Sequence, residues 1–448
     1  MEVKSKYTQI VITAIPLILS TSGMAIMQFV DAMFLAWHSP VSIAASGSAG
    51  CIAYTISSFL LGIVSYTSVL TSNYVGASKN TKVGSAVWQG IHISVFFGIV
   101  TFLLSFFSKP FFRMCGHEAI LAGEEGIYLQ ILLSGGIIHF VVAALSGFFS
   151  GRADNTRLMI ATLSGHGVNI IGDYVLIFGK FGFPKLGIAG ATLATVGSAL
   201  VPFALLSWMF LSHVNRHSFA TWHGRGVKWD MMKNLLTFGT PSGLVQMTDA
   251  IMWSIFLIIM GRFGDIVLAS STVVFRLNSL SLMPVIGIAR AASAFVGQCH
   301  GRKDHRETIA YIWRGAIICY VWMVVVSATF LIFPETYFKM FFEEGCANHD
   351  ELVKTSTFFL YFVCFYCLAD SLNVSLCMSL QAVGDTKWIS IVQTIAAISL
   401  SVFLLCCEYF NASITFIWTM VTAYIVCLPP FWIWRLCQGK WKNIVVAR

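Results

Sequence analysis

Residues 10–36 have the sequence IVITAIPLILSTSGMAIMQFVDAMFLA, in which Asp31 is the single charged side chain. A transmembrane helix needs about 20 mostly apolar residues, whereas a transmembrane β-strand needs about ten residues of alternating polarity. The long apolar run therefore predicts a helix that crosses a membrane. Outward from this stretch, further apolar runs of the same kind follow near residues 46–73, 87–107, 127–149, 158–179, 187–212, 236–260, 266–296, 310–333, 355–380, 388–408 and 413–436.

The composition of the whole chain agrees with a helical membrane protein. Of its 448 residues, 57% are hydrophobic and 11% are charged, whereas ordinary globular chains contain about a quarter charged residues. So little charge excludes a soluble protein, which must cover its surface with polar groups, and also excludes a disordered chain or a small disulfide scaffold. We therefore expect an all-α membrane protein with twelve transmembrane helices.

The distribution of basic residues predicts how the helices are oriented. Counted over the loops, 19 Lys and Arg residues fall on the side of the N-terminus and 7 on the other side. Because cytoplasmic loops carry the excess of Lys and Arg, both termini are expected in the cytoplasm of a multi-pass protein of the plasma (inner) membrane. The net charge of +8 is spread over short loops, and we expect no nucleic-acid partner.

The two halves of the chain repeat one another. Matching residues separated by 225 positions are Pro16 and Pro241, Gly62 and Gly287, Gly76 and Gly301, and Trp88 and Trp313. With six spans in each half, both halves enter the membrane in the same orientation, which predicts two parallel six-helix lobes related by a pseudo-two-fold axis along the membrane normal. We expect an N-lobe at residues 1–212, a cytoplasmic linker at 213–235 and a C-lobe at 236–448. This organisation is typical of transporters.

Four carboxylates lie within the apolar spans, namely Asp31, Asp173, Asp249 and Asp370. An ionisable group at mid-membrane costs about 2.5–3.5 kcal/mol even on a lenient insertion scale, so function is the default interpretation. The carboxylates either titrate or bind cations in a water-filled cavity, or they form structural ion pairs with the intramembrane arginines. We favour the first interpretation for the carboxylates, because four of them exceed two arginines, and we interpret Arg276 as a counter-charge.

For two of these carboxylates, a second polar residue lies one helical turn earlier in the sequence. Asn169 and Asp173 are four residues apart, as are Tyr366 and Asp370, so the members of each pair share one helix face. Carbonyl, hydroxyl and carboxylate oxygens on one face suit a hard cation or a shared proton. We expect no metal site other than one for Na⁺, and no cofactor besides H⁺ or Na⁺ as a coupling ion.

An ordered series of motifs resembles the multidrug and toxic compound extrusion (MATE) family over nearly the whole chain. The motifs are Ile15-Pro16, Phe29-Val-Asp31, Asn73-Tyr-Val-Gly-Ala77, Asn169-Ile-Ile-Gly-Asp173, Gly187-Ile-Ala-Gly-Ala-Thr-Leu-Ala-Thr195, Gly239-Thr-Pro241, Val296-Gly-Gln298 and Gln381-Ala-Val-Gly-Asp-Thr386. The resemblance implies twelve helices in two six-helix lobes that exchange organic cations for H⁺ or Na⁺ by alternating access.

The resemblance also implies roles for individual residues. The family's N-lobe site for the coupling cation matches Asp31, Asn169, Asp173 and Thr195. Pro16 matches the proline at which the first helix is thought to bend, and would be the hinge. The C-lobe site for cation or substrate matches Asp249, Tyr366 and Asp370, although the sodium-coupled bacterial branch usually has Glu at the position of Asp249.

The sequence lacks the motifs of several other membrane functions. The sequence has no Walker motif and no catalytic triad or zinc signature, so we expect neither ATP-driven export nor an enzyme. A lipid-linked sugar flippase of the same superfamily is the alternative, for which more basic residues would be expected in the cavity. A membrane-embedded receptor fits the duplication less well. The expected partners are small organic cations and the lipid bilayer, and we expect a monomer.

Overall fold

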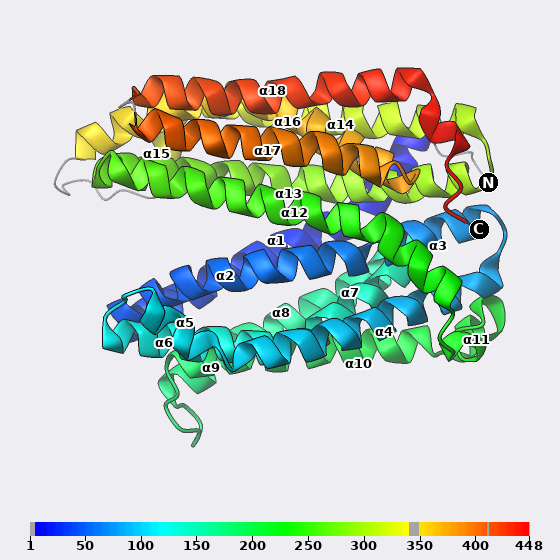
Figure 1. Ribbon diagram of the computed structural model, residues 1–448, viewed down its shortest axis with the longest axis horizontal. Helices are drawn as coiled ribbons and strands as arrows, with labels where there is room; N and C mark the ends of the chain where they lie inside the picture. Colours follow the sequence, from blue (N-terminus) through cyan, green and yellow to red (C-terminus); the bar gives the residue numbers. More distant parts are fainter. Residues whose placement is uncertain (1–4, 340–348, 410–411, 448) are drawn as a thin grey trace. The chain divides into compact units, whose positions relative to one another are not determined.

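The computed structural model describes residues 5–339, 349–409 and 412–447, and the regular secondary structure of these residues is entirely helical (Figure 1). The α-helices are α1 (Lys6–His38), α2 (Pro40–Ser65), α3 (Thr67–Gly76), α4 (Asn80–Ser105), α5 (Ser108–Met114), α6 (Ala119–Ser134), α7 (Gly136–Gly151), α8 (Asn155–Phe178), α9 (Ile188–Ser198), α10 (Leu200–Phe210), α11 (His213–Phe219), α12 (Trp229–Arg262), α13 (Asp265–Gly301), α14 (His305–Ile332), α15 (Pro334–Lys339), α16 (His349–Ala382), α17 (Thr386–Tyr409) and α18 (Ile414–Gln438). Two 3₁₀ turns, η1 (His223–Arg225) and η2 (Lys440–Asn443), complete the elements.

Twelve of these segments match the twelve predicted spans. In the described part of the chain, eleven segments are each long and apolar enough to cross a membrane, and α6 with α7 forms a further span that is bent by 42°. The segments α2–α3 and α9–α10 each count as one span, because Tyr66 and Ala199, which separate their members, keep nearly helical backbone angles. The predicted all-α membrane fold is confirmed.

Several helices are longer than the apolar runs from which they were predicted. Helix α13 has 37 residues, which corresponds to about 55 Å at 1.5 Å per residue, whereas the hydrocarbon core of a bilayer is about 30 Å thick. The hydrophobic run ends where polar residues such as Gln298 and His300 begin, but the backbone hydrogen bonding continues through them. Apolar patterning therefore locates a span without locating the ends of its helix.

The described chain divides into two compact units. The C-terminal unit comprises the chain up to Ile18, Thr248–Val296 and Asp304–Val445, and the N-terminal unit comprises Leu19–Met247, Gly297–Lys303 and the chain from Val446. Within the N-terminal unit α4 runs along α7, and within the C-terminal unit α16 packs between α14 and α18 (Figure 1). Helices α1, α12 and α13 are shared, because each begins in one unit and ends in the other.

The segment predicted as a linker is anchored to α4 of the N-terminal unit. Trp88 Nε1 donates to the carbonyl of Thr221 at 2.6 Å, and Gln89 Oε1 accepts from the backbone N–H of Lys228 at 3.0 Å. The Lys228 ammonium also donates to Ser85 Oγ at 2.8 Å. These bonds hold residues 221–228 against the helix, so the segment is a structured connection in this unit.

A buried ion pair ties the loop after α16 to α18 in the C-terminal unit. Arg435 Nε donates to Asp385 Oδ2 at 2.6 Å, and Arg435 Nη2 donates to Asp385 Oδ1 at 3.0 Å. The side chains are 14% and 4% exposed, respectively, and the guanidinium also lies 4.9 Å from the centre of the Trp388 ring. The two parallel bonds form a bidentate pair, the geometry in which Arg and a carboxylate interact most strongly.

Glycines at repeat-related positions allow helices to cross at close range. A Cβ atom added at Gly62 on α2 would lie 2.6 Å from Gly243 Cα on α12, within the N-terminal unit. The repeat-related contact lies in the C-terminal unit, where a Cβ added at Gly287 on α13 would lie 2.7 Å from Ile18 Cγ1 on α1. Both partners in the second contact are 225 positions from their equivalents in the first. The duplication thus extends to individual helix crossings.

A second crossing joins the ends of α3 and α13, both within the N-terminal unit. A Cβ at Gly76 would lie 2.0 Å from the Gln298 carbonyl oxygen, and one at Gly301 would lie 2.2 Å from the Asn73 carbonyl oxygen. These two contacts are again related by 225 positions. The crossing is therefore symmetric, and any side chain at either glycine would displace backbone.

We expect Gly62→Ala to destabilise the protein by about 1–3 kcal/mol, because the new methyl group would overlap backbone that cannot move aside. Thermal unfolding in detergent micelles measures the change. Gly47→Ala is the matched control on the same helix, since a Cβ at Gly47 has no neighbour within 4 Å and Ala is the better helix former. Equal melting temperatures for the two variants would contradict the crossing.

Candidate functional site

Asp31 on α1 and Asp173 on α8 meet in the N-terminal unit. Their carboxyl groups are close enough to interact electrostatically. The Asp173 side chain is fully buried, and neither carboxylate has an ion-pair partner among the described residues. Two unpaired negative charges in a low dielectric repel each other, and a proton or a monovalent cation between them relieves that repulsion.

The remaining two predicted N-lobe residues complete a cluster of oxygen atoms. Asn169, one helical turn before Asp173, donates from Nδ2 to Thr195 Oγ1 on α9 at 3.5 Å. Its carbonyl oxygen, both Asp173 oxygens and Asp31 Oδ1 are buried and accept no hydrogen bond from the described part of the chain. Buried acceptors normally have partners. This surplus of acceptors without donors has the chemistry of a site for a proton or a hard cation.

Tyr128 on α6 is a member of this cluster that the sequence analysis missed. Its phenol lies within Coulombic range of both Asp31 and Asp173, and its side chain packs against a hydrophobic cluster that includes Phe34 and Leu35 of α1. A search restricted to charged residues in apolar spans overlooks a tyrosine. The signal available in the sequence was a tyrosine hydroxyl about one helical turn after Glu124 and Glu125.

Pro16 lies within α1, which is continuous from Lys6 to His38. A proline removes one backbone hydrogen bond and crowds the preceding turn, which makes a helix easier to bend there. The boundary between the two units crosses α1 directly after Ile18, two residues beyond Pro16. Asp31 thus belongs to the part of α1 in the N-terminal unit, and Pro16 lies just beyond that boundary in the C-terminal unit.

The C-terminal unit holds the second acidic cluster. Asp249 on α12 lies within Coulombic range of Asp370 on α16. Asp370 Oδ1 accepts from Asn373 Nδ2 at 3.2 Å, and Asn373 Oδ1 accepts from the buried Trp432 Nε1 of α18 at 2.8 Å. Asp370 is therefore positioned by a hydrogen-bond chain, whereas Asp31 Oδ1 and both Asp173 oxygens have no donor among the described residues.

Two tyrosines face this second cluster. Tyr366, which was predicted from its spacing, is buried and lies within Coulombic range of Asp370. Tyr424 on α18, which was not predicted, lies within Coulombic range of Asp249 and Asp370. Both hydroxyls are buried with no hydrogen-bond partner in the described residues. The structure thus brings Asp249, Tyr366 and Asp370 together and adds Tyr424.

Arg276 on α13 is not part of either cluster in the structure. Arg276 is exposed, and within the described ranges it forms no ion pair with a carboxylate. Its role as a counter-charge stays a prediction.

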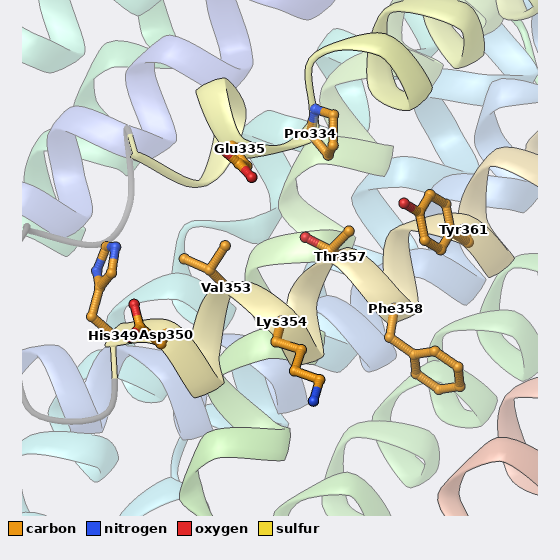
Figure 2. A pocket seen from close by; sticks show the side chains of 9 residues that line it. All are labelled: Pro334, Glu335, His349, Asp350, Val353, Lys354, Thr357, Phe358 and Tyr361. Atoms are coloured by element: carbon orange, nitrogen blue, oxygen red, sulfur yellow. The ribbon is translucent and has the colours of Figure 1, made fainter.

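A surface pocket of about 650 Å³ lies elsewhere in the C-terminal unit, where α15 meets the first turns of α16 (Figure 2). It is lined by Pro334, Glu335, His349, Asp350, Val353, Lys354, Thr357, Phe358 and Tyr361. None of the predicted site residues is among them. The lining residue nearest to Asp370 in sequence is Tyr361, nine residues earlier on α16.

Comparison with known sequences points to a single family. The sequence model described as MatE matches residues 16–175 and 241–406, which together cover most of the chain and fall into the two repeats. A probable multidrug resistance protein NorM of Thermotoga maritima is 25% identical over 426 residues, covering 93% of this chain and 89% of that protein. The NorM protein of Bacillus subtilis is 23% identical, with 86% and 84% covered.

Solved structures share the fold. A crystal structure of MATE in complex with MaL6 has a TM-score of 0.88 at 19% identity, covering 98% of this chain and 97% of the other. A transporter of the MOP superfamily from Pyrococcus furiosus, reported with a binding pocket of reversed polarity, gives the same TM-score, identity and coverage. Because the family model spans both halves and the fold agrees over nearly the full length, this chain belongs to the MatE family of multidrug and toxic compound extrusion transporters and has their two-lobe fold.

Proposed function

We propose that the protein is a secondary active exporter that exchanges small organic cations for H⁺ or Na⁺. The observation that carries the proposal is the pair of acidic clusters, Asp31–Asp173 and Asp249–Asp370, each placed inside apolar helices of one unit. Intramembrane carboxylates without basic partners are costly and are a mark of proton relays and ion pathways. The NorM relatives are described as probable multidrug resistance proteins, which supports organic compounds as the substrates.

The N-terminal cluster is proposed as the coupling site. Asp31, Asn169 and Asp173 present buried oxygens without donors, whereas Asp370 already accepts a hydrogen bond from Asn373. A bound proton or Na⁺ therefore neutralises more uncompensated charge in the N-terminal cluster. Thr195, which Asn169 contacts, supplies a further oxygen. Asp249, Tyr366 and Asp370 are proposed to bind the cation or the substrate in the C-lobe.

The proposed mechanism uses α1 as the moving element. Neutralising Asp31 and Asp173 removes the repulsion between them and lets the N-lobe part of α1 repack. Pro16 weakens the helix two residues before it passes from one unit to the other, so the movement is concentrated there. The substrate cation is then released outward, and deprotonation or loss of Na⁺ toward the cytoplasm restores the anionic cluster that attracts the next cation.

The acidic character of both clusters supports this function over that of a lipid-linked sugar flippase. A flippase must hold a diphosphate, and Arg or Lys residues provide that recognition. The described contacts place Asp, Asn, Thr and Tyr at the two clusters. We also propose that the protein functions as a monomer in the inner membrane with both termini in the cytoplasm, as the basic residues of the loops predict.

The proposal is tested with purified protein in lipid vesicles that contain a fluorescent organic cation. A pH gradient and a Na⁺ gradient are imposed separately, and we expect one of them to drive movement of the cation against its own gradient. If neither gradient drives transport beyond that in protein-free vesicles, exchange is the wrong function. Movement of a lipid-linked sugar in the same vesicles would favour the flippase.

A further inference from the structure

A buried glutamate of the N-terminal unit lies outside the acidic pair. Glu125 on α6 has a side chain that is 0% exposed, and both of its oxygens are hydrogen-bonded. Oε2 lies 2.7 Å from His117 Nδ1, and Oε1 accepts from the hydroxyl of Ser48 on α2. A carboxylate inside a membrane span is costly unless it has such partners, and ionisable residues at these depths mark ion and proton pathways.

His117 connects this carboxylate to the surface. It lies in the loop between α5 and α6, and its side chain is 36% exposed. The ring packs beside Phe112, with ring centres 5.8 Å apart, so its position is defined on one side while the other side faces outward. One ring nitrogen of His117 thus contacts the buried carboxylate, and the partly exposed ring can donate or accept a hydrogen bond through either nitrogen.

On the inner side, Glu125 is followed one turn later by Tyr128 on the same face of α6. Side chains at this spacing lie about 5–6 Å apart at Cβ, and a water molecule can connect polar groups that do not touch directly. Tyr128 in turn lies within Coulombic range of Asp31 and Asp173. His117, which contacts Glu125, and Tyr128, which lies one turn further along α6, thus place proton-carrying groups between the loop and the acidic pair.

Other ionisable groups lie on α6, on the elements that pack against it and on the loop before it. Helix α9, which packs on α6, contributes none. Lys109 of α5 packs against Gly126 through its aliphatic carbons. The remaining titratable or charged groups on the elements that pack against α6, and on the loop before it, are Cys51, Tyr54, Lys82, His92, Arg113, Cys115, Glu118, Glu124 and His139.

We propose that His117 and Glu125 form a proton relay between the aqueous surface at the α5–α6 loop and the Asp31–Asp173 pair. The relay rests on the proposed function with H⁺ as the coupling ion. A proton binds His117 Nε2, and the proton on Nδ1 moves to Glu125 Oε2. The Glu125 proton then passes through Tyr128 or one water to the acidic pair. Each step breaks one N–H or O–H bond and forms another, with no oxidation or reduction.

The test compares single substitutions in vesicles that report proton flux and cation transport together. Glu125→Gln keeps the shape and the hydrogen-bonding capacity toward Ser48 and His117 but cannot carry the proton. We expect proton-coupled transport to slow by about tenfold or more, as positioned proton carriers allow, while equilibrium binding of the fluorescent cation and the melting temperature stay unchanged. Glu124→Gln is the matched control on the neighbouring residue and should transport at the normal rate.

His117→Gln gives a second, more exposed variant in case Glu125→Gln fails to fold. We expect the transport rate to depend less on the external proton concentration, because the exposed group that accepts the proton has been removed. The relay is overturned if both variants transport normally while Asp31→Asn does not, an outcome that leaves the proposed function intact.

Two further results would also overturn the relay. A parallel loss of melting temperature, binding and transport in both variants would mean that the His117–Glu125 pair only holds the loop in place. Transport driven by Na⁺ and not by H⁺ would mean that the His117–Glu125 pair carries no coupling proton. Normal coupling in Asp31→Asn would show that the Asp31–Asp173 pair is not the coupling site, and the relay that leads to this pair would then be wrong as well.

Discussion

Asp31→Asn is expected to abolish the dependence of substrate export on the coupling cation. The substitution removes one of two adjacent charges, so the Asp31–Asp173 cluster no longer gains free energy by binding a proton or Na⁺. Coupling free energies between two ligand sites are about 1–3 kcal/mol, which corresponds to about 5–150-fold in affinity. Uphill transport should fall by a factor in that range, and the remaining rate should lose its dependence on pH and Na⁺.

The measurement is uptake of a fluorescent cation into vesicles over a range of pH and Na⁺ concentrations. Asp230→Asn is the control, because Asp230 lies in the first turn of α12 and is exposed. Export by Asp31→Asn at the normal rate, with unchanged dependence on both ions, would show that the acidic pair of the N-terminal unit does not carry the coupling. Asp370→Asn would then test the second cluster.

Asp385→Ala is expected to destabilise the protein by about 3–5 kcal/mol, because it leaves the guanidinium of Arg435 buried without its partner. The two side chains are nearly enclosed and share two hydrogen bonds. The free energy of unfolding in denaturant, measured in mixed micelles, reports the loss.

A double variant distinguishes the loss of the ion pair from the cost of leaving one charge buried alone. Asp385→Ala combined with Arg435→Met removes both charges, and we expect it to be more stable than Asp385→Ala alone, because an apolar replacement of a buried pair avoids the isolated charge. If the double variant loses as much stability, relative to the unmodified protein, as the two single variants lose together, the two residues do not interact and the ion pair is not a determinant of stability.

Much of the candidate site could be predicted from the sequence. Asp31 and Asp173 were recognisable because a charge in an apolar span is expensive, and Asn169 was recognisable from its spacing of one turn. Their convergence was not predictable from spacing, since α1 and α8 are separated by more than a hundred residues. Tyr128 and Tyr424 escaped notice because a tyrosine in a membrane span is also an ordinary packing residue.

For the repeat too, the sequence indicated the two halves, and the structure showed which residues make contact. The 225-residue interval between Gly62 and Gly287 indicated two equivalent halves. It did not show that Gly62 packs against Gly243 of α12, or that Gly287 packs against Ile18 of α1. Each of these contacts lies in the unit in which α12 or α1 begins. Asp385 likewise stood in a family motif, but its partner Arg435 lies 50 residues later.

By itself the sequence determined that this protein is helical, spans a membrane about twelve times and consists of two parallel halves. These properties depend on local apolar length and on repetition, which are written along the chain. Only the tertiary structure decided which carboxylates meet, which hydroxyls join them and where Glu125 finds His117. Those pairings depend on how separate helices pack, and the packing is the sum of many small side-chain contacts that no single stretch of sequence contains.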